Sequence, residues 1–213
     1  MSFFLSLAKG DFEARNLLKE AVLARYATRP LPLEAVVLTL QRRERAFLGV
    51  PLTVTVEAAY AEPDRWLWQE TRRLLGIPLG QRAESLDDQT DPSLRESLRR
   101  QQWAFRALLL TPLTREGVTL RAVAERAFQA VEESQPEAVA TLYLKPDYSL
   151  AAVEVERYRP SDKRRLPYTL RPEGGYQNLN GINLPLQIAE QWGSEPSRLY
   201  TISAAQPINR WRT

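Results

Sequence analysis

Two amphipathic segments joined by a tight turn constrain the fold more than any other feature of this sequence. Residues 138–145 and 150–158 both alternate apolar and polar side chains, and the Pro-Asp-Tyr-Ser tetrapeptide between them is typical of a turn. We therefore expect an antiparallel hairpin with one buried apolar face and one exposed polar face. In the expected register the opposite pairs are Lys145 with Leu150, Leu142 with Val153, and Ala140 with Val155.

The rest of the chain predicts further strands and several helices. Regular alternation predicts a half-buried strand at 51–60, and β-branched residues favour a strand over a helix at 34–40. A last strand is expected at about 199–203. Helical spacing and terminal signals predict five helices, at 11–28, about 63–75, 92–110, 114 or 119 to about 134, and about 184–192. Loops are expected at 80–91 and 159–182.

The helix at 92–110 is the clearest of the five. Asp91 is suited to cap it, and Pro92 occupies the first helical position. Together the elements predict an α+β fold with a mainly antiparallel sheet of at least four strands flanked by about five helices. We expect a single domain that spans residues 1–213.

The chain contains no cysteine and no histidine, which excludes much of enzyme chemistry. Disulfides, cysteine-ligated zinc, a Ser-His-Asp triad, a cysteine nucleophile and a histidine base are all ruled out. Any reaction would have to use carboxylates, lysine, arginine, hydroxyls or amides. We expect no cofactor and no specific metal site, and the composition favours a binding or assembly protein over an enzyme.

Neither hydropathy nor the N-terminal residues indicate a membrane protein. No apolar run approaches the roughly twenty residues that a membrane-spanning helix requires. The first residues lack a basic leader, so they do not resemble a signal peptide. The sequence therefore predicts a cytoplasmic protein without a membrane partner.

A basic, tyrosine-containing segment provides the main functional hypothesis. Between Arg157 and Tyr176 lie six basic and two acidic residues, a local charge of +4 in a chain whose net charge is +3. Cations that bind phosphates, alternating with rings that stack on bases, are typical of single-strand binding. We expect nucleic acid or another polyanion as the partner. The candidate nucleic-acid-binding residues are Arg157, Tyr158, Arg159, Lys163, Arg164, Arg165, Tyr168 and Arg171.

An alternative hypothesis is a divergent magnesium-dependent nuclease. Asp147, Glu154 and Glu156 are similar to the Pro-Asp…(Asp/Glu)-x-Lys arrangement of metal-dependent nucleases, although Glu156 stands where the lysine is expected. The hairpin itself offers a simpler explanation, since these carboxylates belong to its exposed face. The acidic string at 87–91 is likewise explained by helix capping.

A third hypothesis is a structural subunit with no role in nucleic-acid binding. In this interpretation the arginines pair with carboxylates of the same chain or of a protein partner. The stripe formed by Arg95, Arg99 and Arg106 on the helix at 92–110 would then cover the edge of the core with its side-chain stems.

Overall fold

The structure is a computed structural model, which describes residues 7–26, 33–45, 49–61, 65–159 and 162–208. Within these ranges the chain forms two α-helices, α1 (Phe12–Arg25) and α2 (Pro92–Leu109), a 3-10 helix at Thr111–Thr114, and twelve strands. The strands are β1 (Lys9–Gly10), β2 (Ala35–Arg45), β3 (Pro51–Ala61), β4 (Arg65–Leu74), β5 (Ile77–Ser85), β6 (Val118–Ala124), β7 (Ala127–Glu132), β8 (Gln135–Leu144), β9 (Leu150–Tyr158), β10 (Arg165–Leu179), β11 (Ile182–Trp192) and β12 (Arg198–Pro207).

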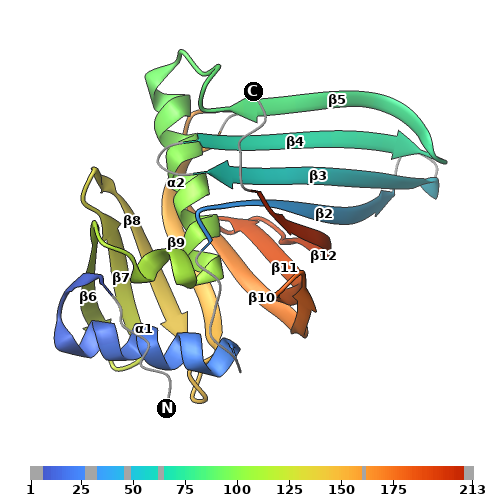
Figure 1. Cartoon of the computed structure of the whole chain (residues 1–213). Coiled ribbons are helices and arrows are strands. Elements are labelled where there is room, and N and C mark those ends of the chain that lie inside the picture. Colours follow the sequence, from blue (N-terminus) through green and yellow to red (C-terminus); the bar gives the residue numbers. More distant parts are fainter. Residues whose placement is uncertain (1–6, 27–32, 46–48, 62–64, 160–161, 209–213) are drawn as a thin grey trace.

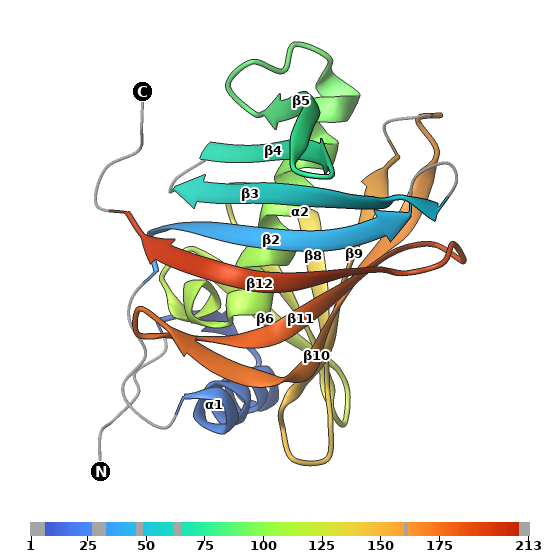
Figure 2. The ribbon, with the colours of Figure 1, turned by 90° about the vertical axis from the view of Figure 1, so that its right-hand side faces the viewer.

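All twelve described strands belong to one sheet, in the order β1-β6-β7-β8-β9-β10-β11-β12-β2-β3-β4-β5. Neighbouring strands are antiparallel, except that β1 runs parallel to β6. Because β2 pairs with β12, the first long strand and the last strand lie side by side, as Figure 2 shows.

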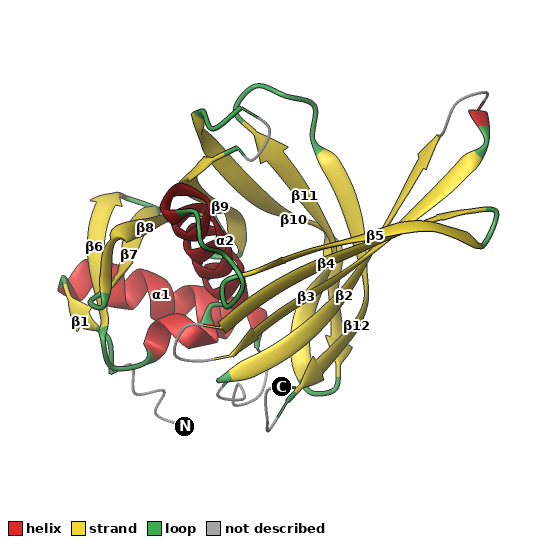
Figure 3. Ribbon diagram, turned by 90° about the horizontal axis from the view of Figure 1, so that it is seen from above, coloured by secondary structure: helices red, strands yellow, loops and turns green. Residues whose placement is uncertain are grey.

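The sheet bends around α2, which lies on its concave side (Figures 1 and 3). Phe105 of α2 packs against Trp66 and Trp68 of β4, with ring centroids 5.3 and 5.6 Å away. On another side of the same helix, Trp103 Nε1 donates a hydrogen bond to the Ala130 carbonyl of β7 at 3.0 Å. A helix that contacts strands near both ends of the sheet requires the sheet to be strongly curved.

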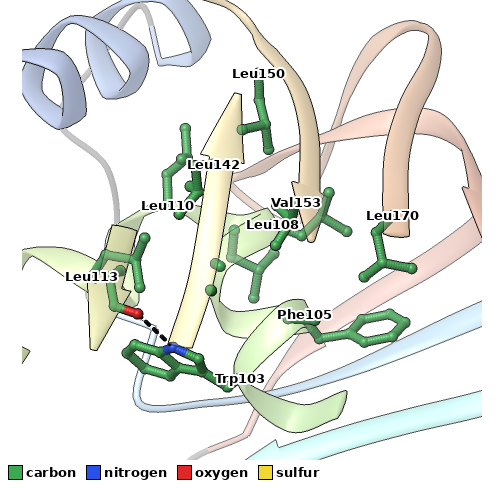
Figure 4. Packing of buried hydrophobic residues seen from close by; sticks show 14 of the residues in the cluster. Trp103, Phe105, Leu108, Leu110, Leu113, Leu142, Leu150, Val153 and Leu170 are labelled. Carbon is green, nitrogen blue, oxygen red and sulfur yellow. Dashed lines mark hydrogen bonds between the residues drawn. The ribbon is translucent and has the colours of Figure 1, made fainter. Parts of the chain in front are cut away.

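The core lies between α2 and the concave face of the sheet. Leu108 of α2 is buried among Leu142 of β8, Val153 of β9 and Leu170 of β10 (Figure 4). Leu142, Val153 and Leu170 belong to strands in which buried and more exposed side chains alternate, and all three are among the buried ones. Burying a side chain of this kind stabilises a fold by about 1.5–3 kcal/mol.

The first helix closes one end of the molecule against β6 and β7 (Figure 1). Its buried stripe includes Ala14, Leu18 and Val22, which confirms a helix over most of the expected range 11–28. The helix ends at Arg25, and residues 27–28 lie outside the described part. Tyr26, just after its C-terminus, donates a hydrogen bond from its hydroxyl to the Leu109 carbonyl at 3.1 Å. This bond satisfies one of the terminal carbonyls of α2.

The α+β expectation of a small sheet flanked by about five helices is wrong, because the chain is mostly strand. The segment expected as a helix at 63–75 is β4, the one at 119–134 is β6 and β7, and the one at 184–192 is β11. The loop expected at 159–182 contains β10, and most of the loop expected at 80–91 is β5 or the turn that follows it. Pairing with neighbouring strands overrides the weak local preference of these segments.

The hairpin formed by β8 and β9 is confirmed, as are α2 and the strands expected at 34–40, 51–60 and 199–203. Leu142 lies opposite Val153 as expected. The expected pair of Lys145 with Leu150 is wrong, because an irregularity between Tyr143 and Leu144 places Leu144 opposite Leu150.

Candidate functional site

A pocket of about 330 Å³ lies on the concave side of the sheet, beside α2. Its lining comes from β4, β5, α2, β9, β11, β12 and the segments that follow β9 and β11, and it consists of aromatic residues, arginines, glutamates and one glutamine. They are the aromatic residues Trp68, Trp192 and Tyr200, the arginines Arg82, Arg157, Arg159 and Arg198, the glutamates Glu70, Glu84, Glu190 and Glu195, and Gln101. With four arginines and four glutamates, the lining is formally neutral.

Aromatic rings form the apolar part of the lining. Trp68 packs edge-on against Phe105 of α2 and against Tyr200 of β12, with centroids 5.6 and 6.2 Å away. Trp192 of β11 packs edge-on against Tyr168 of β10 at 4.9 Å. Edge-to-face contacts of this kind hold the rings rigidly in place.

Arg157 is the most unusual group in the pocket, because its side chain is only 2% exposed. Its guanidinium lies 4.6 Å from the centroid of the Tyr168 ring and 4.7 Å from that of the Trp192 ring. Its Nε donates to the Ser97 carbonyl at 3.0 Å, whereas its Nη1 is buried without a hydrogen-bond partner. Burial lowers the pKa of Arg157, while Tyr168, Glu190 and other acidic groups act in the opposite direction.

The carboxylates of the pocket already have partners. Glu190 is buried and accepts a hydrogen bond from the Tyr200 hydroxyl at 3.1 Å. Burial, reinforced by this carboxylate, raises the pKa of Tyr200. The other three glutamates pair with arginines: Glu70 with Arg72 and Glu84 with Arg82, both at 2.6 Å, and Glu195 with Arg159. Arg157 and Arg198 differ from the other two arginines of the pocket, because no described carboxylate lies within ion-pair distance of either.

This arrangement is suited to holding a ligand. Rings offer an apolar surface, and a guanidinium can only donate hydrogen bonds, so the pocket matches a molecule with an apolar part and an acceptor group. Within the described residues no group of three or more acidic side chains is placed to hold a metal ion.

The basic segment does not form a nucleic-acid surface, and that interpretation is wrong. Tyr168 is fully buried and Arg157 nearly so, which prevents them from stacking on bases or contacting phosphates. Tyr158 is half-buried on β9, where its carbonyl accepts a hydrogen bond from Ser97 Oγ at 2.7 Å.

Of the remaining cations of the segment, all but Arg171 pair with carboxylates of the same chain. Arg159 pairs with Asp162 and Glu195, Lys163 with Asp91 at 2.8 Å, Arg164 with Asp162 at 3.5 Å, and Arg165 with Glu156 at 2.8 Å, while Arg171 donates to Gln191 at 2.6 Å. These pairs add the carboxylates of Asp91, Glu156 and Glu195, which reduces the local charge from +4 to +1. The arginines therefore pair with carboxylates of the same chain, which is one of the two arrangements that the third hypothesis allows.

The nuclease interpretation is also wrong. Asp147 Oδ1 accepts hydrogen bonds from the Ser149 amide at 3.0 Å and the Ser149 hydroxyl at 2.7 Å, which lowers the pKa of Asp147 and holds it in the turn. Glu156 is paired with Arg165, and no acidic cluster joins Asp147 to Glu154. In the string at 87–91, Asp91 caps α2, as expected.

Sequence reasoning missed most of the pocket. It assigned Trp68 and Trp192 to helices, and it gave no role to Glu190 or Tyr200. Trp66 and Trp68 stand two residues apart, which is the spacing of one face of a strand, and this was the one local signal for β4.

Comparisons with known proteins support no assignment to a family. No family model matches the chain, and no curated protein matches it significantly. Similar solved structures are a LolA superfamily protein from Nitrosomonas europaea (12% identity, TM-score 0.43, covering 92% of this chain and 94% of that one) and a putative outer membrane lipoprotein-sorting protein domain from Vibrio parahaemolyticus (12%, 0.40, 93% and 95%). A third is a DUF1329 family protein from Desulfovibrio piger (8%, 0.39, 94% and 95%).

The cytoplasmic location that we expected from the sequence is not retained. It rested on the first residues of the chain, of which residues 1–6 lie outside the described part. Neither α1 nor α2 is long and apolar enough to cross a membrane.

Proposed function

We propose that this chain binds a small amphipathic ligand, an acyl chain that ends in a carboxylate or an ester, in the pocket beside α2. The observation that carries the proposal is Arg157, a nearly buried arginine that lines a pocket walled by aromatic rings and has no described carboxylate within ion-pair distance. A ligand oxygen that reaches this guanidinium gains a charge-assisted hydrogen bond, which is worth about 1.5–3 kcal/mol.

The charge of the ligand follows from the partners already present. The carboxylates at the pocket are held by arginines or by Tyr200, so they do not require a cationic ligand. Arg157 contacts ring faces and the Ser97 oxygens, whereas Glu190 and Glu84 act on it from beyond ion-pair distance. A charge-assisted bond to a carboxylate oxygen is stronger than one to a neutral acceptor.

The size of the pocket sets the scale of the ligand. Its 330 Å³ lies at the lower end of the roughly 300–1,000 Å³ typical of small-molecule sites. The rings of Trp68, Trp192 and Tyr200 provide the surface against which the apolar part would pack.

Calorimetry with three ligands of equal chain length tests the proposal. Decanoate should bind, methyl decanoate should bind more weakly, and decyltrimethylammonium should bind at least about tenfold more weakly than decanoate, since one charge-assisted hydrogen bond is worth about 1.5–3 kcal/mol. No binding of any of the three, or equal binding of the cation, would contradict the proposal.

A pair of matched variants locates the site. Arg157→Lys removes the Nη1 donor and should weaken decanoate binding about tenfold or more. Arg171→Lys is the control, because Arg171 is a half-buried arginine of β10 that donates to Gln191 and does not line the pocket. The control should bind decanoate as the unmodified chain does.

A further inference from the structure

The tip of the β4–β5 hairpin, residues 74–79, exposes an unusual amount of apolar surface. Leu75, Ile77 and Leu79 are 72%, 66% and 60% exposed, and Pro78 beside them is also exposed. They stand within five residues of each other on a hairpin that projects from the body of the molecule (Figure 3). Single exposed leucines are ordinary, whereas a continuous apolar tip indicates a contact surface.

The backbone of the turn is a second, independent observation. Leu75 and Gly76 both have positive φ, at 50° and 86°, which is the conformation of a two-residue hairpin turn of the mirror-image type. Asparagine, aspartate or glycine is normally found at the first of these positions, because a leucine there is strained. The chain therefore places an apolar side chain at the most exposed point of the hairpin, against its local conformational preference.

Arginines surround this tip. The β2–β3 hairpin ends on the same side of the sheet, since Leu52 at the start of β3 lies opposite Leu74 at the end of β4. Residues 43–45 and 72–79 together contain four arginines and one glutamate, which leaves a charge of +3, equal to the net charge of the whole chain. Among them, Arg43, Arg45 and Arg73 are exposed.

We propose that this end of the sheet docks on an anionic lipid surface, with residues 74–79 inserted among the lipids and the surrounding arginines held at the phosphates. Apolar side chains at an interface ringed by cations match such a surface in both polarity and charge. A peripheral contact of this kind needs no membrane-spanning helix, and the described residues contain none. The proposal therefore replaces the expectation that the protein has no membrane partner.

Co-sedimentation with vesicles tests this docking. The chain should bind vesicles of equal parts phosphatidylglycerol and phosphatidylcholine, and it should bind pure phosphatidylcholine at least about tenfold more weakly, because each basic residue near an anionic surface contributes about fivefold in affinity. Raising the salt concentration should reduce the binding to the anionic vesicles.

Two sets of variants separate the apolar from the charged contribution. The triple variant Leu75→Asn, Ile77→Thr, Leu79→Thr should lose about tenfold or more of its vesicle binding. It should also remain folded, because asparagine suits the left-handed turn position and threonine suits a strand. Arg43→Gln with Arg73→Gln should lose the preference for anionic vesicles. Val123→Thr on β6, another exposed apolar position (47%) away from the tip, should bind as the unmodified chain does.

Three results would overturn the proposal. One is the absence of binding to either vesicle, and another is binding that the triple variant leaves intact. The third is a chain that does not bind vesicles but forms a dimer in solution, if the triple variant abolishes that dimer. In that case the tip would bind a second copy of the chain. The vesicles contain no decanoate, so a failure of vesicle binding does not bear on ligand binding in the pocket, which calorimetry tests separately.

Discussion

The indole of Trp68 on β4 meets the ring of Tyr200 on β12 edge-on, with centroids 6.2 Å apart, although β2 and β3 lie between their strands in the sheet. Side chains from strands three places apart touch only if the sheet curves sharply between them. That curvature forms the pocket, because it directs the inward side chains of β4, β11 and β12 towards one another. The geometry of the pocket therefore depends on the ring contacts that span the concave face.

The first prediction concerns these contacts. Trp68→Ala should lower the free energy of unfolding by about 3 kcal/mol or more, because it leaves a cavity beside Phe105 and Tyr200. Urea denaturation followed by circular dichroism measures the change. Trp68→Phe retains a ring and should lose less than half as much. Equal losses for both variants would show that the ring contacts do not support the curvature.

The sequence predicted those parts of the fold that are determined by local pattern. The hairpin of β8 and β9 was predicted correctly because the apolar alternation and the turn residues indicate the same structure there. The helix α2 was predicted correctly because Asp91, Pro92 and a long apolar stripe each indicate it independently. The segment that ends near 134 was assigned to a helix because Thr114 or Thr119 could begin one and Pro136 could end it. Its pairing with neighbouring strands is a tertiary effect.

The pocket had no comparable local signal. Its residues are spread from Trp68 to Tyr200 and come together only through the curvature of the sheet. Arg157 was identified as a candidate from charge, but charge alone predicted a solvent-exposed phosphate contact. Its burial between Tyr168 and Trp192 follows from the register of β9, β10 and β11. This register was not predicted, because residues 159–182 were expected to form a loop.

The second prediction concerns a buried ion pair between α2 and β7. Arg106 Nη1 donates to both carboxylate oxygens of Glu132, at 3.2 and 3.1 Å, and Arg115 pairs with the same carboxylate. Glu132→Gln should destabilise the fold by about 3–5 kcal/mol, because it leaves the Arg106 cation buried without its counterion. Urea denaturation at neutral pH measures the loss.

The neighbouring residue gives a matched control for that measurement. Glu133 pairs with Lys9 at 3.1 Å, and both side chains are largely exposed. Glu133→Gln should change the free energy of unfolding by less than about 1 kcal/mol. If the two glutamine variants proved equally stable, the pair of Arg106 with Glu132 would not hold α2 to the sheet.

The third prediction concerns acid stability at the start of α2. Lys163 Nζ lies 2.8 Å from Asp91 Oδ2, while Ser93 donates to Oδ1, and these bonds lower the pKa of Asp91. A carboxyl whose folded pKa is depressed stabilises the fold above its unfolded pKa of about 3.9 and loses that contribution as the pH falls towards the folded value.

Asp91→Asn isolates this contribution, because asparagine still caps a helix but does not ionise. The variant should unfold at lower temperature than the unmodified chain at pH 7, and the difference should disappear progressively below about pH 4. Thermal unfolding measured across this range checks it. A difference that persists unchanged at pH 2 would show that the charge on Asp91 contributes nothing.

The last prediction is that Arg157 lowers the stability of the fold in exchange for ligand binding. Arg157→Met keeps the stem and rings in contact but removes a desolvated cation with an unpartnered nitrogen, so the free energy of unfolding should stay equal or rise by about 1 kcal/mol. Decanoate binding should fall at least tenfold in the same variant.

Arg100→Met is the matched control, because Arg100 is also buried and its Nε also lacks a partner, but it pairs with Glu96 at 2.5 Å and donates to the Glu156 carbonyl at 3.1 Å. That variant should be destabilised by about 1–3 kcal/mol with little change in binding. A large loss of stability in Arg157→Met, matching that of Arg100→Met, would mean that Arg157 is a structural residue and not a ligand-binding one.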